Sequence, residues 1–188
     1  MSGFIGGLGL SAIPSALPHP GIRTGTNYYI SPTGASSTAT ALMNANLAYY
    51  QPFILPGMAI DRVGLETTVG AGNARVGFYS NLNGTPDTLI LDAGILDVSG
   101  AAINEITLSP LLYLPQAWVW GCIVYSGTPT VRSGAAVTSG YILGVPTPSS
   151  GGTRALHATL TYGALPAQAS LVGLVPQTSS ALMLLRKT

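Results

Sequence analysis

Residues 72–92 read GNARVGFYSNLNGTPDTLILD, a pattern of two strands joined by a turn that indicates the fold. In the first half, Val76 and Phe78 alternate with Arg75 and Tyr79, so a strand there would point Val76 and Phe78 into a core. The turn falls within residues 81–87, where an Asn-Gly pair and a following proline are typical of a tight connection. The stretch therefore predicts strands over residues 74–80 and 88–92.

Short runs of strand-forming residues continue on both sides of this stretch. Turn signals recur roughly every 8–12 residues, which is typical of a β-sandwich or barrel. In residues 60–67, IDRVGLET, alternation predicts Val63 and Leu65 on one face and Ile60 on the other. Residues 35–45 are the one helix candidate, and they would form one or two helical turns or else an irregular loop. We expect strands over residues 27–30, 47–54, 59–68, 74–80, 88–92, 104–108, 117–125, 141–145, 156–162, 170–174 and 181–185.

The run at 117–125, AWVWGCIVY, is apolar on both of its faces. Such a pattern is typical of a strand that is covered on both sides. A second subunit is a candidate for the outer cover. The single cysteine, Cys122, lies in this run, and we expect it to be a buried and inert thiol.

These elements predict an all-β domain, an antiparallel jelly-roll β-sandwich over 27–188, with an extended N-terminal arm over 1–26. The arm is apolar, nearly uncharged and rich in Gly and Pro, so we expect it to order against a neighbouring subunit. Prolines and glycines interrupt 4–22, which argues against a membrane-spanning helix, and the first basic residue, Arg23, comes too late for a signal peptide. A membrane-active reading of residues 4–10 is a minor alternative. The apolar side chains expected to anchor the arm are Phe4, Ile5, Leu8, Leu10, Ile13 and Leu17.

Charged side chains are scarce throughout the chain. Only 7% of the 188 residues are Asp, Glu, Lys or Arg, and the net charge is +1, whereas ordinary soluble domains carry about 25%. Seven basic residues scattered among six acidic ones give no electrostatic footprint for nucleic acid. Little charge keeps such a chain apart from its copies, so we expect a homo-oligomer whose apolar surfaces are buried in an assembly.

Residues able to carry catalysis are few and scattered. His19 lies between two prolines of the arm, and His157 is expected on the solvent or interface face of its strand. Asp61 and Glu66 are expected to form surface or inter-strand ion pairs, although paired acids remain a catalytic alternative. The chain has no Gly-x-Ser-x-Gly elbow and no metal-ligand motif. We therefore expect no enzyme activity, no metal and no cofactor.

Two binding sites remain as alternatives. Three aspartates spaced by five residues are candidates for a loop-borne calcium site, as in some carbohydrate-binding jelly rolls. They are Asp87, Asp92 and Asp97. Four aromatic residues are candidates for an interface or a sugar-stacking platform. They are Tyr49, Tyr50, Trp118 and Trp120.

Residues 49–66, YYQPFILPGMAIDRVGLE, resemble a recurring opening of β-sandwich modules in tailed-bacteriophage virion proteins. Residues 72–94 and the closing stretch at 118–132, WVWGCIVYSGTPTVR, resemble the rest of such a module, so the likeness covers about residues 47–132. The resemblance implies a virion jelly roll that usually trimerises, as in head decorations, head fibres and tail fibres. It implies no catalytic residue.

The resemblance, together with the scarcity of charge and the apolar arm, implies a phage structural protein, a capsid decoration or head-fibre or spike-base protein that is assembled in the host cytoplasm. Its partners would be its own copies, most often as a trimer, and the major capsid or tail protein to which the arm attaches. The alternative is a tail-fibre or baseplate carbohydrate-binding module that recognises host surface glycans.

Overall fold

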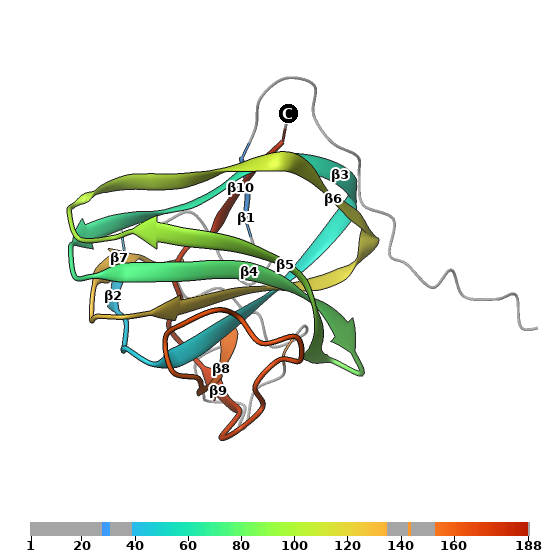
Figure 1. The fold of residues 1–188 in the computed structure, drawn as a ribbon. Coiled ribbons are helices and arrows are strands. Elements are labelled where there is room, and N and C mark those ends of the chain that lie inside the picture. Colours follow the sequence, from blue (N-terminus) through green and yellow to red (C-terminus); the bar gives the residue numbers. More distant parts are fainter. Residues whose placement is uncertain (1–27, 31–38, 135–142, 144–152, 188) are drawn as a thin grey trace, which may run out of the picture.

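The computed structural model describes residues 28–30, 39–134, 143 and 153–187, and these ranges build an all-β molecule (Figure 1). No helix among them is long and apolar enough to cross a membrane. The strands are β1 (Tyr28–Ile30), β2 (Thr40–Leu42), β3 (Leu47–Val69), β4 (Asn73–Leu82), β5 (Thr85–Asp97), β6 (Ala102–Tyr125), β7 (Thr130–Arg132), β8 (Ala155–Thr159), β9 (Val175–Gln177) and β10 (Leu184–Lys187).

Two long antiparallel strands, β3 and β6, run through both layers of a sandwich. They pair along nearly their whole length, from Ala48 opposite Val124 to Thr67 opposite Ala102. In the first layer the strand order is β5-β4-β6-β3-β8-β9. In the second layer β3 pairs with β6, β10 and β7, and β10 and β7 pair in turn with β1 and β2. The predicted all-β antiparallel sandwich of jelly-roll type is confirmed.

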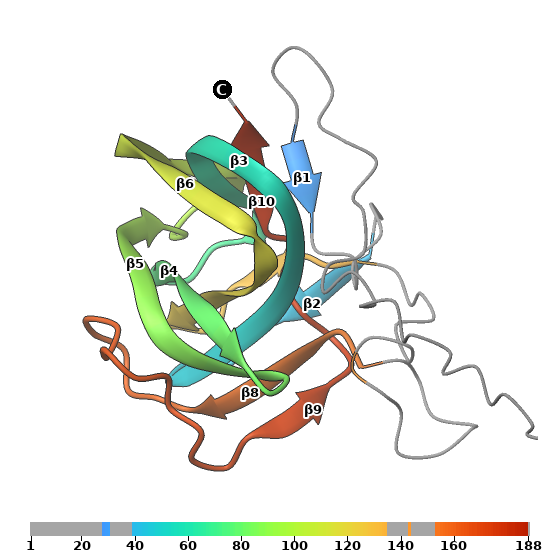
Figure 2. The same cartoon turned by 90° about the vertical axis from the view of Figure 1, so that its right-hand side faces the viewer.

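The layer change occurs where β3 and β6 carry prolines. Figure 2 shows β3 curving around the core from one layer to the other. Pro56 on β3 pairs with Gln116 on β6, next to Gly57 and Pro115. Proline donates no backbone hydrogen bond and glycine has no Cβ, so the ladder bends most easily at these residues. The predicted strands at 47–54 and 59–68 are therefore parts of one bent strand, as are those at 104–108 and 117–125.

The main core lies between the two layers. Val63, Leu65, Val76 and Phe78 are buried there, as alternation predicts. Ile60 is also in this core, and its predicted placement on the opposite face is wrong. The register between β3 and β6 shifts between Ile60 and Arg62, so the alternation of side chains is reset at this irregularity.

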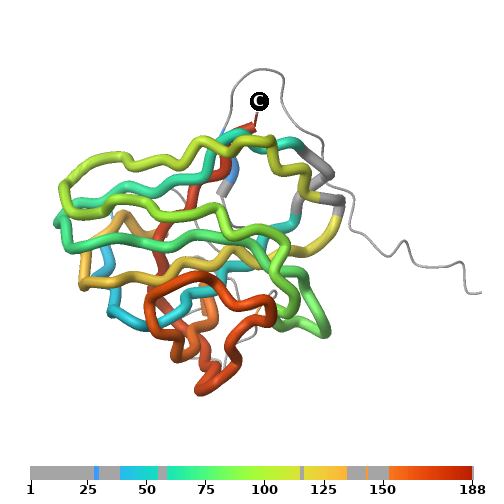
Figure 3. Tube along the Cα trace, in the orientation of Figure 1, coloured from blue at the N-terminus to red at the C-terminus, as the bar shows by residue number. Residues whose placement is uncertain are grey.

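A second core covers the outer face of the first layer. Trp120, Cys122 and Tyr79 point to this face and are buried there, beside the side chains of β8 in the same sheet and beneath residues 160–174. We name residues 160–174 the strap. Figure 3 shows the strap, in orange-red, lying across this layer. The outer cover expected from a second subunit is therefore supplied by the chain itself.

Other predictions differ from the structure in local detail. The helix candidate at 35–45 is wrong within its described part, because residues 40–42 form β2. Residues 170–174 are not a strand, and β9 follows them instead. The arm at 1–26, with its anchor residues and His19, lies outside the described residues, as does nearly all of the strand expected at 141–145.

Gly64 on β3 offers a test of the close pairing with β6. A Cβ at this position would lie 2.4 Å from the carbonyl oxygen of Asn104 and 3.0 Å from the Cγ of Glu105. We expect Gly64→Ala to lower the free energy of unfolding by about 1–3 kcal/mol, measured by chemical denaturation, because the backbones must separate.

The matched control is Gly100→Ala, where an added Cβ would meet nothing within 4 Å. This variant is expected to unfold within about 0.5 kcal/mol of the parent chain. Equal stability of the two variants would contradict the described packing of β3 on β6.

Candidate functional site

The described residues that were considered for catalysis are not brought together, and His19 lies outside the described ranges. Cys122 is fully buried, and burial raises the pKa of its thiol. His157 on β8 is half-buried, with its ring centroid 6.0 Å from that of Tyr49. The described residues contain no group of three or more His, Cys, Asp or Glu side chains that could hold a metal ion.

Four of the six carboxylates form ion pairs with arginines on other strands. The interpretation of Asp61 and Glu66 as inter-strand ion pairs is confirmed. These contacts neutralise most of the few charges that the chain carries. The pairs are Asp61–Arg186, Arg62–Glu105, Glu66–Arg132 and Arg75–Asp92.

Two of these pairs lie in the second layer. Asp61–Arg186 joins β3 to β10, and Arg62–Glu105 joins β3 to β6. The Glu105 carboxylate accepts hydrogen bonds from the Tyr28 hydroxyl, at 2.6 Å, and from Arg62, at 2.9 Å. The bond to Glu105 raises the pKa of Tyr28, and the bond from Arg186 lowers the pKa of Asp61. These hydrogen bonds and ion pairs link β1, β3, β6 and β10.

The aromatic platform considered from the sequence is not on the surface. Tyr49, Tyr50 and Trp120 are buried, and Trp118 is half-buried. The Trp120 indole donates to Asn81 Oδ1 at 2.9 Å, and the Tyr50 hydroxyl donates to the Ser170 carbonyl at 3.2 Å. Tyr50 and Trp120 belong to the second core beneath the strap, and Tyr49 belongs to the main core.

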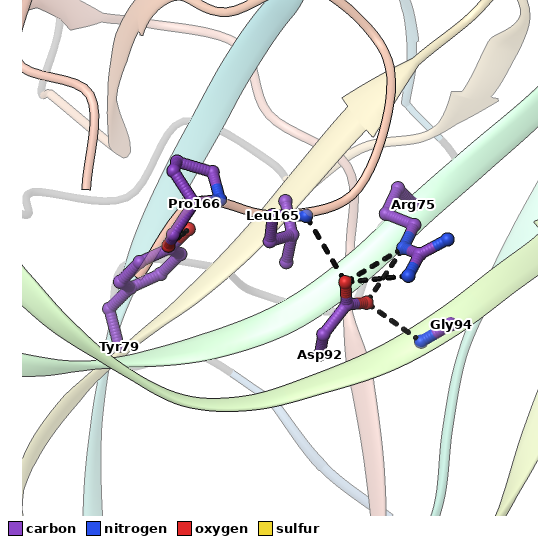
Figure 4. A network of polar contacts seen from close by, with 6 residues as sticks. All are labelled: Arg75, Tyr79, Asp92, Gly94, Leu165 and Pro166. Carbon is purple, nitrogen blue, oxygen red and sulfur yellow. Dashed lines mark hydrogen bonds and ion pairs between the residues drawn. The ribbon is translucent and has the colours of Figure 1, made fainter. Parts of the chain in front are cut away.

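Asp92 clamps the strap to the sheet (Figure 4). Its carboxylate accepts hydrogen bonds from Arg75 Nε at 2.7 Å and Nη2 at 2.6 Å, and from the backbone N–H groups of Leu165 and Gly94 at 3.1 Å each. Nearby, the Tyr79 hydroxyl donates to the Pro166 carbonyl at 2.9 Å. Burial of Asp92 opposes its ionisation, but these hydrogen bonds outweigh burial and hold its pKa below the ordinary value of 3.8.

The two other aspartates of the calcium hypothesis make local bonds. Asp87 accepts from the Thr88 hydroxyl, and Asp97 accepts from the Ser99 backbone N–H. The structure does not bring the three aspartates together as a metal-binding group. Asp92 instead holds the strap.

Two strand edges have no neighbouring strand among the described residues at one side of the sandwich. β5 is the last strand of the first layer. In β6, residues 102–107 and 112–114 pair with β3 and with no other described strand, whereas residues 108–111 are left out of the β3 register. A cavity of about 230 Å³ lies between these edges, lined by residues 91–93 and 107–112. We name it the edge slot. Leu91, Ala93 and Leu112 of its lining pack against the main core.

Large apolar side chains are exposed on the two strands that form the edge slot. Tyr113 on β6 is 68% exposed and Ile95 on β5 is 57% exposed. An open edge with apolar side chains is a surface to which another strand can add. Local sequence patterns did not predict this surface, although the apolar run LLYL at 111–114 lies beyond the strand expected at 104–108. The exposed side chains are Ile90, Ile95, Ile103, Leu111 and Tyr113.

Comparisons with known proteins identify a shared fold and no family. No protein-family model matches the chain, and no curated protein matches it. The chain is similar to a solved structure of the clostridial cysteine protease Cwp84, a cysteine-to-alanine variant after propeptide cleavage. The TM-score is 0.50 and the identity 13%, over 87% of this chain and 40% of that chain.

A second similar structure holds the cysteine protease and lectin-like domains of Cwp84, described as a surface-layer-associated protein of Clostridium difficile. Its TM-score is 0.49 and its identity 11%, over 87% of this chain and 36% of that chain. The chain thus spans less than half the length of either structure. At this level of identity the likeness shows the fold alone.

The Asp92 clamp can be tested by substitution. Asp92→Asn removes the charge that Arg75 and the strap share, and we expect a loss of about 1–3 kcal/mol in the free energy of unfolding. The strap should also open more often, so Cys122 beneath it should react faster with a thiol reagent under native conditions. Asp97→Asn, which touches only its own turn, is the control and should change neither measurement.

The same clamp predicts a pH dependence. Because the folded pKa of Asp92 lies below 3.8, its contribution to stability is present above that pH and is lost as the pH falls through the folded pKa. The difference in unfolding free energy between the parent chain and Asp92→Asn should therefore shrink below about pH 3.8. A constant difference down to pH 2 would contradict the assignment.

Proposed function

We propose that the chain is a structural subunit of a tailed-bacteriophage virion, which forms a homo-oligomer through apolar surfaces and attaches to the particle through residues 1–26. The observation that supports oligomerisation is the row of exposed apolar side chains beside two unpaired strand edges. The virion setting rests on the sequence resemblance over residues 47–132.

The energetics favour association over a solitary molecule. Burial of apolar surface stabilises by roughly 25 cal/mol per Å², and the exposed side chains on β5 and β6 are large. Association at this surface meets little electrostatic opposition, because four of the six carboxylates are already paired with arginines. A subunit of this kind requires no catalytic group.

A trimeric capsid decoration or head-fibre base protein, attached to the major capsid or tail protein, is the specific form that we propose. The alternative, a tail-fibre or baseplate module that recognises host glycans, has less support. Its aromatic platform would need accessible rings, whereas Tyr49, Tyr50 and Trp120 lie in the interior.

Two measurements test the proposal. Sedimentation equilibrium of the purified full chain is expected to give an oligomer, with three times the 19.2 kDa of one chain for a trimer. Purified phage particles whose genome encodes the chain should contain it, detected by mass spectrometry and located by gold-labelled antibody in the electron microscope. A monomer at all accessible concentrations, together with particles that lack the protein, would overturn the proposal.

A further inference from the structure

We propose that residues 4–13 of one copy insert as an extended strand into the edge slot of a neighbouring copy. This inference rests on the proposed function, because it presumes that the chain forms an oligomer. The inference adds the binding site on one copy, the edge slot, and the segment of the neighbouring copy that fills it.

The edge slot offers backbone groups that need partners. Buried peptide N–H and C=O groups are nearly always hydrogen-bonded, so two open edges around an apolar cavity favour the addition of a strand. The strap already pairs with one end of the β5 edge, where Leu89 N donates to the Ala167 carbonyl at 2.9 Å and Ala169 N donates to the Asp87 carbonyl at 2.7 Å. The rest of β5, residues 90–97, has no such partner among the described residues.

The size of the edge slot fits side chains of a peptide. Its volume is about 230 Å³, whereas an engineered cavity of about 150 Å³ holds benzene and sites for drug-sized ligands begin near 300 Å³. Leu91 and Leu112 belong both to the lining and to the border of the main core. An inserted leucine would therefore extend the existing core.

Residues 4–13, FIGGLGLSAI, have the chemistry that the edge slot requires. They carry no charge, and from residue 8 the larger Leu8, Leu10 and Ala12 alternate with Gly9 and Ser11. An extended strand places these two sets on opposite faces, the first toward the slot. Ten extended residues span about 33 Å, which is longer than the eight-residue β5 edge at 90–97.

No unpaired charge on the lining opposes this insertion. Asp92 is the one ionisable residue that lines the edge slot, and its carboxylate is held by Arg75 and the N–H of Leu165. An uncharged segment that enters the slot therefore buries no unpaired charge of the lining.

The position of β1 favours a neighbouring copy as the donor. β1 follows the arm in the sequence, and it lies at the far edge of the second layer, beyond β10 and β3 from β6. Figure 2 shows β1 on one side of the molecule and β5 and β6 on the other. Donation from copy to copy is a head-to-tail contact, and such contacts form a ring such as a trimer when the rotation between copies closes.

Disulfide trapping tests the insertion directly. We expect a mixture of the single variants Leu8→Cys and Leu111→Cys to form a covalent dimer under mild oxidation, because Leu111 lines the edge slot. Leu42→Cys is the matched control, since Leu42 is 64% exposed but lies on β2. Cross-linking to residue 42 as efficient as to residue 111, or only within one chain when both cysteines share it, would overturn the proposal.

Oligomer strength provides a second readout. Leu111→Lys places a charge at a half-exposed position and should weaken the oligomer at least tenfold, whereas Leu42→Lys should leave it unchanged. A synthetic peptide of residues 2–17 should dissociate the oligomer of the full chain. An oligomer that resists both treatments would overturn the inference and leave the proposed function standing, whereas a monomeric parent chain would count against the proposed function itself.

Discussion

The pairing of β3 with β6 determines the rest of the architecture. Because both strands bend together at their prolines, one ladder runs through both layers and forms the centre of the first. The bend also creates the open side of the molecule. In the first layer the outer edge of β6 meets β4, whereas in the second layer the continuation of that edge at residues 102–114 has no strand of the described part of the chain beside it.

Most charged side chains of this protein form ion pairs between its own strands. Each of the four ion pairs joins residues on different strands, and one of them, Arg75–Asp92, also holds the strap through the N–H of Leu165. Asp92 on β5 thus connects its own strand, the neighbouring strand β4 and the strap. With so few charges in total, the exposed surface is left to apolar and neutral polar side chains.

Local signals in the sequence predicted the fold class but not the surface that we assign to assembly. The strands around 74–92 were predictable because alternation and the Asn-Gly turn lie within a few residues of each other. The burial of Trp120 was not, because its cover comes from residues 160–174, far along the chain. The edge slot depends on which strand edges lack a neighbour, and no local pattern encodes that property. Residues 40–42 could not be recognised as a strand, because their strand partner, β7, is distant in the sequence.

The four ion pairs form within the chain, and this affects the rate at which the chain associates with other molecules. Paired charges produce little field at a distance, so encounters proceed without long-range guidance, at the rates of about 10⁵–10⁶ M⁻¹s⁻¹ that are typical of neutral surfaces. Ionic strength, which screens charges beyond about 8 Å under physiological conditions, then has little influence on these rates. Excluded salts such as sulfate act on apolar contact instead, and they strengthen it.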